Sequence, residues 1–149
     1  MPWVSEDLCR RTNDLLDQLE QYRTEEEILY LTAQAVAETT DPQKLLDFLV
    51  ERLGRRLGAT YGHILLLDEN KECLHVRATW GVPLSKCAHM KIAVGKGITG
   101  WVAMTGQPAL VGDVSEDPRY FQGEPDTVSE VSVPLRVRGE IIGVLNLEK

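Results

Sequence analysis

The last third of the chain, residues 92–149, constrains the fold more strongly than any other segment. It ends in two stretches of largely alternating apolar and polar residues, 128–137 and 140–147, with Arg138-Gly139-Glu140 at the tip between them. This alternation, interrupted by a short glycine-containing turn, predicts an antiparallel β-hairpin. A glycine-rich turn from Gly95 to Gly100, a short helix over 98–105 and a strand within 108–114 precede the hairpin. The segment therefore predicts a domain that combines helices with an antiparallel sheet.

The residues before this segment complete the same domain. Asp41-Pro42 predicts a helix start, with Asp41 as the N-cap, and Gly58 predicts its end. Strands are expected over 61–68, 72–80 and 90–94, where the apolar pattern changes to that of a sheet. The predicted fold class for residues 41–149 is therefore α+β, with a central antiparallel sheet flanked by helices.

Residues 1–40 predict a separate helical extension. Apolar residues repeat there at spacings of three and four, the pattern of a seam between helices. Thr24-Glu25-Glu26-Glu27 resembles a capping box, which leaves open one long helix or a bent pair. The repeat could also lie on the domain's own sheet, but we expect it to form a homodimer. The predicted interface consists of Leu8, Leu15, Leu19, Tyr22 and Leu29.

Composition excludes several classes of partner. The chain has 149 residues, of which 43% are hydrophobic, so it can build a core. The net charge is −7 and no basic stripe is present, which argues against nucleic-acid binding. No apolar run approaches the length of a membrane span, and the start lacks a signal-peptide pattern. Three cysteines without C-x-x-C spacing indicate free thiols, so we expect a cytoplasmic location without membrane contact.

Four motifs resemble the GAF family of small-molecule-sensing domains. They are G-K-G-I-T-G-W-V-A (residues 95–103), D-V-S-E-D-P-R-Y (113–120), S-V-P-L (132–135) and G-E-I-I-G-V-L-N-L (139–147). The resemblance covers roughly residues 40–149 and implies a non-catalytic regulatory module of a bacterial signalling protein, such as a sensor histidine kinase. It also implies that ligand occupancy is passed through terminal helices of a dimer to an output domain. Because this family continues into a helix after the last strand, we expect the chain to be an excised module.

The resemblance also implies where a ligand would bind. Pockets of this family lie between the sheet, the short helix and the loop that contains Asp117-Pro118. N–H groups at the start of the short helix could hold an anionic or carbonyl group. The expected ligand-binding residues are Trp80, Met90, Gly97, Ile98, Thr99, Trp101, Val111, Asp113, Arg119, Tyr120 and Phe121.

Other activities on this fold match less well. The spaced Asn-Lys-Phe-Asp-Glu signature of cyclic-nucleotide-binding relatives cannot be placed, so that reading is a minor alternative. Free methionine-R-sulfoxide reductases carry a cysteine in the glycine turn, where this chain has Thr99. Cys87-Ala88-His89 lies upstream of the position at which relatives attach bilin. Gly95-x-Gly97-x-x-Gly100 lacks the βαβ unit of a dinucleotide site. No catalytic residues are therefore expected.

Two Cys-x-His pairs raise the question of metal binding. Cys73 and His75 would share one strand face, and Cys87 and His89 could approach them. The spacing is irregular for zinc, so we expect no metal and no cofactor.

The main rival function is a dimerisation scaffold that binds no ligand. In that case Trp101, Met104, Tyr120 and Phe121 would fill the pocket. A cavity of about 300 Å³ or more would favour sensing, and a solid core would favour the scaffold.

Overall fold

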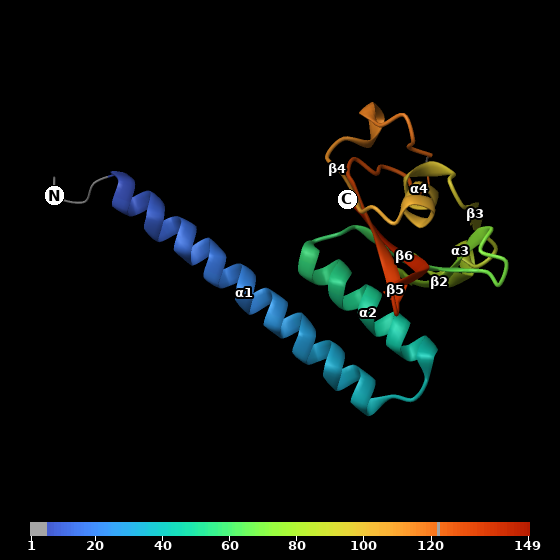
Figure 1. Ribbon diagram of the computed structural model, residues 1–149, viewed down its shortest axis with the longest axis horizontal. Coiled ribbons are helices and arrows are strands. Elements are labelled where there is room, and N and C mark those ends of the chain that lie inside the picture. Colours follow the sequence, from blue (N-terminus) through green and yellow to red (C-terminus); the bar gives the residue numbers. More distant parts are fainter. Residues whose placement is uncertain (1–5, 122) are drawn as a thin grey trace. The chain divides into compact units, whose positions relative to one another are not determined.

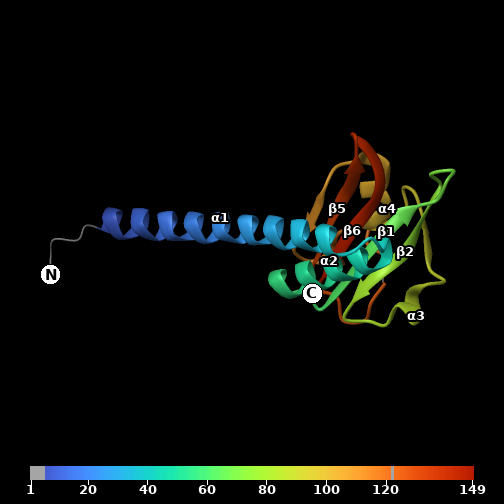
Figure 2. The same ribbon diagram turned by 90° about the horizontal axis from the view of Figure 1, so that it is seen from below.

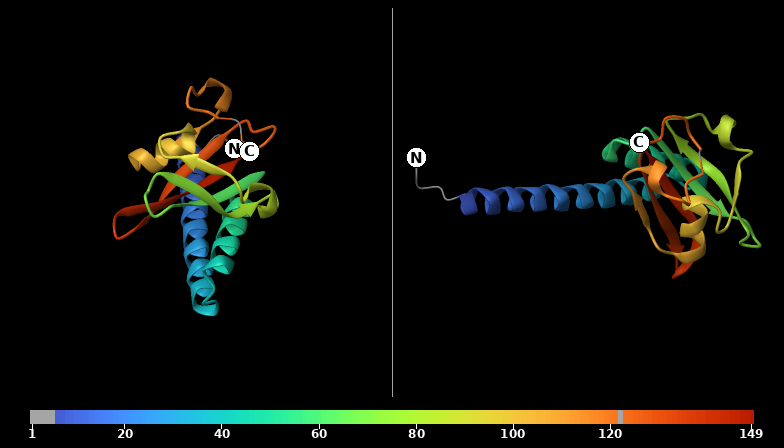
Figure 3. Two further views of the ribbon diagram at one scale, coloured as in Figure 1. Left: turned by 90° about the vertical axis from the view of Figure 1, so that its right-hand side faces the viewer. Right: turned by 90° about the horizontal axis from the view of Figure 1, so that it is seen from above.

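The computed structural model describes residues 6–121 and 123–149, and the chain divides into two units, Met1–Thr40 and Asp41–Lys149. The first unit contains α1 (Glu6–Glu38), one uninterrupted helix of 33 residues (Figure 3). Thr24 lies inside this helix, where its Oγ1 donates to the Glu20 carbonyl at 2.8 Å, so it does not cap a second helix. Of the two arrangements that the sequence left open, the continuous helix is the one observed.

The second unit contains a six-stranded sheet in the order β3-β2-β1-β6-β5-β4, and every neighbouring pair is antiparallel. This confirms the predicted α+β class. Its elements are α2 (Pro42–Leu57), β1 (Tyr61–Leu67), β2 (Cys73–Trp80), α3 (Leu84–Cys87), β3 (Lys91–Ala93), α4 (Gly97–Thr105), β4 (Ala109–Val111), the 3₁₀ helix η1 (Val114–Glu116), β5 (Glu130–Val137) and β6 (Glu140–Glu148). Only α3 and η1 were not predicted.

Helix α2 begins and ends where the sequence indicated. The Asp41 carboxylate accepts a hydrogen bond from the Gln43 N–H at 3.0 Å, and Gly58 ends the helix with a φ of 65°. Val50 is fully buried on its apolar face. No helix within residues 6–121 and 123–149 is both long enough and apolar enough to cross a membrane.

The two faces of the sheet carry separate cores. On one face, α2 packs against β1 and β2 around Val50, Ile64 and Leu147. On the other face, α4 packs against β5 and β6 around Val102 and Val144. Figures 1 and 2 show α2 and α4 on opposite sides of the strands. Because both faces are covered, any polar side chain on the α4 face lies inside the domain.

A β-bulge in β2 exchanges the faces of the residues on either side of it. Ile64 pairs with Ala78 and Leu65 pairs with Val76, which leaves Arg77 as the extra residue. Val76 consequently joins the core under α4, whereas Trp80 joins the core under α2. The indole of Trp80 donates to the Ala59 carbonyl at 3.1 Å, on the side away from α4.

The glycine turn before α4 is closed by close backbone contacts. Gly95 and Gly97 have φ angles of 84° and 68°, positive values that glycine adopts without steric cost. The Gly95 N–H donates to the Gly100 carbonyl at 2.8 Å. A side chain on Gly100 would place its Cβ 2.5 Å from the Ala93 carbonyl oxygen. The turn therefore fixes the position at which α4 starts.

We expect Gly97→Val to lower the free energy of unfolding by about 1–3 kcal/mol, since a β-branched residue is strained at positive φ. Chemical denaturation measures the change. Gly112→Val is the matched control, because Gly112 has open space around its Cβ position and no positive φ. Equal stability of the two variants would contradict this account of the turn.

Candidate ligand-binding site

A cavity of about 190 Å³ lies between the α4 face of the sheet, the start of α4 and the loop before β5. It is smaller than the roughly 300 Å³ at which ligand pockets usually begin, but it is not a solid core. Its lining residues are His63, Leu65, Val76, Met90, Lys91, Ile92, Lys96, Gly97, Ile98, Thr99, Tyr120, Phe121, Gly123, Glu124, Glu130, Asn146 and Glu148.

Acidic and amide side chains from the two hairpin strands form one wall of the cavity. Glu130 on β5 lies directly opposite Glu148 on β6, and Asn146 on β6 lies opposite His63 on β1. All four residues are buried. Since alternate residues of a strand share a face, the sheet register brings these groups together on the α4 side.

Hydrogen bonds hold Glu148 in place. Its Oε1 accepts from the Asn146 amide at 2.8 Å, and its Oε2 accepts from the Thr127 hydroxyl at 2.6 Å. The amide of Asn146 is thereby oriented with its oxygen toward Ser132, whose Oγ lies 2.6 Å from Asn146 Oδ1. The position of Glu148 is consequently set by both the sheet and the loop.

Glu130 is the most strongly perturbed carboxyl group of this wall. Burial, followed by the nearby charge of Glu148, raises its pKa from 4.5 to about 7, although hydrogen bonds with Ser132 and Thr99 act in the opposite direction. Ser132 has a single hydroxyl proton, and its shorter contact is with Asn146. The 3.2 Å contact between Ser132 Oγ and Glu130 Oε1 is then best satisfied when Glu130 itself carries a proton.

A second cluster joins this wall to the loop. His63 Nε2 lies 3.3 Å from Glu124 Oε1, and the thiol of Cys87 donates to the same oxygen at 3.7 Å. Burial, and then the charge of Glu124, raises the pKa of Cys87, so the thiol is neutral at neutral pH. Glu124 is only partly exposed, and it is the third carboxylate that lines the cavity.

Positive groups lie at a different part of the cavity lining. Lys91 and Lys96 contribute to it, and both are exposed. Lys96 is also the N-cap of α4 and makes no side-chain cap, and the first N–H groups of a helix have no acceptor within it. The site therefore offers hydrogen-bond donors at the helix start and acceptors on the sheet.

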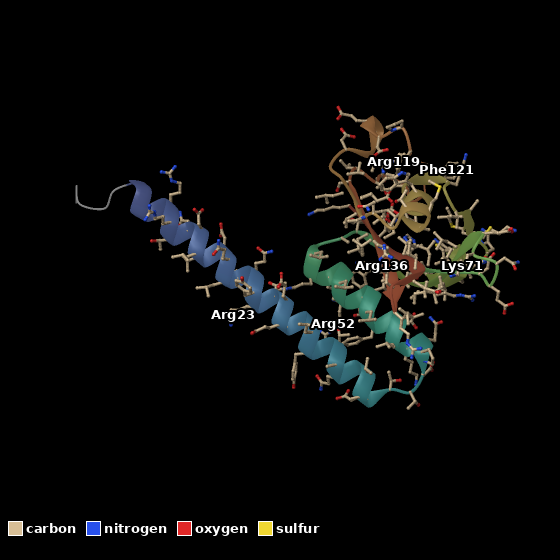
Figure 4. All side chains as sticks on the ribbon, viewed as in Figure 1. Arg23, Arg52, Lys71, Arg119, Phe121 and Arg136 are labelled. Atoms are coloured by element: carbon tan, nitrogen blue, oxygen red, sulfur yellow. The ribbon has the colours of Figure 1, made fainter. Side chains whose placement is uncertain are left out.

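Six of the expected ligand-binding residues line the cavity: Met90, Gly97, Ile98, Thr99, Tyr120 and Phe121. Figure 4 shows Phe121 beside Arg119 in the part of the domain that contains α4. The side chain of Phe121 is 70% exposed, whereas Thr99 is buried and donates to Glu130 at 3.4 Å. Contact of any of them with a ligand stays a prediction.

The other five expected residues do not line it. Trp80 lies on the α2 face because of the bulge. Arg119 forms a two-point ion pair with Asp117, at 2.6 and 2.9 Å, and stacks over Trp101 at 4.4 Å from the ring centroid. The two remaining residues have roles in the fold. Val111 is part of the core, and Asp113 caps η1 by accepting a hydrogen bond from the Ser115 N–H.

The most polar lining residues were not among those expected. The sequence does contain a pattern that could have identified them, namely the alternation of polar and apolar residues along the two hairpin strands. Glu130 and Ser132 alternate with valines on β5, and Asn146 and Glu148 alternate with leucines on β6. When both faces of a sheet are covered, such polar i and i+2 pairs must point into the domain. No comparable signal identifies Glu124, which lies in a loop.

The Cys-x-His pairs do not gather as considered above. Within residues 6–121 and 123–149, the close group of three potential metal ligands is His63, Cys87 and Glu124. Of the four residues considered, it contains only Cys87. Cys73 and His75 lie on β2 beside β3, and His89 is exposed.

The raised pKa of Glu130 predicts that folding stability depends on pH. A carboxyl group with a higher pKa in the folded state stabilises it fully below pH 4.5, and this contribution is lost as the pH rises through about 7. Glu130→Gln should remove that dependence and raise the free energy of unfolding at pH 8 by about 1–3 kcal/mol. Chemical denaturation at a series of pH values from 5 to 8 measures the free energy of unfolding of both proteins. Glu140→Gln, at the exposed hairpin tip, is the control. Identical pH profiles for Glu130→Gln and the unaltered protein would contradict the assignment.

Sequence comparison connects the chain with bacterial regulators. It is 27% identical to the Nif-specific regulatory protein of Azospirillum lipoferum over 128 residues, which cover 81% of this chain and 20% of that protein. The chain thus spans about a fifth of the length of the regulator that it matches.

Solved structures share the fold. The GAF domain of the Acinetobacter phosphoenolpyruvate-protein phosphotransferase has a TM-score of 0.76 at 20% identity, covering 85% of this chain and 77% of that chain. Free methionine-R-sulfoxide reductase from Neisseria meningitidis, solved with its substrate, has a TM-score of 0.73 at 27% identity. The match covers 83% of this chain and 72% of the reductase chain. The sequence also matches the GAF domain family over residues 39–149. The chain therefore belongs to the GAF domain family.

Proposed function

We propose that this GAF domain is a non-catalytic sensory module that binds a small zwitterionic molecule, of the type of a free amino acid, in its cavity. The observation that carries the proposal is the opposed pair of buried glutamates, Glu130 and Glu148, in the cavity wall. A ligand with one ammonium group would replace the proton on Glu130 and reduce the repulsion between the two carboxylates.

The other charged end of such a ligand has a complementary partner. The first N–H groups of α4 and the side chain of Lys96 favour an anionic group. Met90, Ile98 and Tyr120 supply apolar surface in the same lining. The modest volume suits a molecule of amino-acid size better than a nucleotide.

The comparisons support the two parts of this proposal separately. The Neisseria reductase is named for free methionine-R-sulfoxide, which is itself an amino-acid derivative. The Azospirillum relative is named as a regulatory protein, which supports a regulatory role. Free methionine-R-sulfoxide reductases on this fold carry a cysteine in the glycine turn, whereas Thr99 stands there in this chain and donates to Glu130. The absence of a cysteine at this position supports ligand binding without catalysis.

Signal transmission through α1 is part of the same proposal. Leu15, Leu19, Tyr22 and Leu29 are exposed in the single chain, while the side chain of Leu8 lies outside those described. A helix of 33 residues is about 50 Å long, which is enough for a parallel dimer seam. Ligand binding would favour one arrangement of that dimer and thereby control an output domain in the cytoplasm, whether in a histidine kinase or in another regulator.

The scaffold alternative requires side chains that fill the pocket. Met104 and Phe121 are 57% and 70% exposed, and Trp101 stacks with Arg119 instead. The cavity that remains, with three carboxylates in its lining, favours ligand binding over a purely structural role.

We expect thermal-shift screening to find stabilisation by zwitterionic amino acids and not by their N-acetylated forms, which lack the ammonium charge. Calorimetric titration of the best ligand should show at least tenfold weaker binding to Glu148→Gln, because a buried charge partner is lost. Glu140→Gln, at the exposed hairpin tip, should bind as the unaltered protein does. Absence of stabilisation by any zwitterion would reject this ligand class, and unchanged affinity of Glu148→Gln would reject the binding mode.

The double substitution Leu15→Glu with Leu19→Glu should convert the dimer to a monomer, because it places charges in the apolar seam. Analytical ultracentrifugation measures the mass. Asp14→Glu with Asp17→Glu is the matched control, since it changes neighbouring residues without altering charge. A dimer that survives the leucine substitutions would place the interface elsewhere.

A further inference from the structure

Three side chains from separate parts of the chain converge beside the cavity. They are His63 from β1, Cys87 from the end of α3 and Glu124 from the loop before β5. One ligand atom from each lies within 4.8 Å of the other two. His63 and Cys87 are buried, and His63 and Glu124 line the cavity. Imidazole nitrogen, thiol sulfur and carboxylate oxygen are all common ligands of zinc.

Two of the three separations match a single coordination sphere, and the third, between His63 and Cys87, is within 4.8 Å. Zinc bonds of about 2.0–2.3 Å in tetrahedral geometry place ligand atoms about 3.4–3.6 Å apart. Here His63 Nε2 lies 3.3 Å from Glu124 Oε1, and Cys87 Sγ lies 3.7 Å from the same oxygen. A metal ion could therefore enter with only small side-chain movements, displacing the thiol proton.

A supporting carboxylate stands behind the histidine. The other ring nitrogen of His63, Nδ1, lies 3.8 Å from Glu148 Oε1, which Asn146 holds in place. Metal-binding histidines commonly direct their second nitrogen at a carboxylate, which orients the ring. The distance is longer than a hydrogen bond and would shorten by a small rotation of the imidazole.

The structure assigns His63, Cys87 and Glu124 as a binding site for one divalent transition-metal ion of the zinc type. Three protein ligands leave a fourth position for water or for an atom of a small molecule, as in open zinc sites. Two of the three ligands, His63 and Glu124, line the cavity, so the site adjoins it. The site shares Glu148 and Glu124 with the cavity of the zwitterion proposal, but neither proposal requires the other to be correct.

Metal binding is tested on the full chain after chelator treatment, with Zn²⁺ in competition with a chromophoric chelator and with Co²⁺ as a spectroscopic probe. The expected result is one ion per chain and a thiolate-to-cobalt charge-transfer absorption. Cys87→Ser should remove that absorption, and both Cys87→Ser and Glu124→Gln should weaken zinc binding at least tenfold. The matched controls Cys73→Ser and His75→Gln, two β2 residues outside the group, should bind as the unaltered protein does.

Several outcomes would overturn the assignment: no zinc binding, unchanged affinity in Cys87→Ser, or loss of binding in Cys73→Ser. Thermal unfolding of the metal-free variants checks that each is folded. If Cys87→Ser does not fold, Glu124→Gln decides, since its substitution lies in a loop and preserves the side-chain shape. The experiment contains no organic ligand, so its failure leaves the zwitterion measurements unaffected, and the reverse also holds.

Discussion

Two glutamates that face each other across neighbouring strands under a covered sheet face are the constraint on which this domain depends. Glu130 and Glu148 occupy directly opposed positions of β5 and β6, and each is buried. Burial raises the pKa of Glu130 to about 7, and the nearby charge of Glu148 adds to this effect, so ionising both carboxylates carries a large penalty. They need a proton, hydrogen-bond donors or a cation. Side-chain hydrogen-bond partners meet part of that requirement beside a cavity of about 190 Å³.

The glycine turn and the loop before β5 position polar side chains around these two glutamates. The glycine turn fixes the start of α4, which brings Thr99 to Glu130. The loop before β5 brings Thr127 to Glu148 and Glu124 to His63. Both faces of the sheet carry an apolar core, but among the described residues the buried carboxylates lie on the α4 face, so this face combines packing with the candidate site. In the proposed mechanism, the ammonium group of a ligand reduces the repulsion between Glu130 and Glu148, and the elements that contact the ligand become ordered.

Much of the fold could be predicted from sequence, because strand alternation, helix caps and turn glycines are local signals. Asp41 and Gly58 bound α2, and the hairpin lies where the alternation placed it. The candidate site was less predictable. Trp80 turns away from the cavity because a bulge at Arg77 exchanges the faces of β2, and a bulge depends on pairing that the sequence does not show. Cys87 and Glu124 meet only through a short helix and a loop, neither of which has a periodic pattern.

Native mass spectrometry of freshly purified protein tests the central claim most directly, because it shows whether the acidic cavity holds a small molecule. We predict an additional mass in the range of a small metabolite, distinct from the mass of a metal ion, that is absent or reduced in Glu148→Gln. A protein that carries no such mass before and after incubation with a mixture of amino acids would contradict the account. In that case the opposed glutamates would be a structural feature of a scaffold and not part of a sensor.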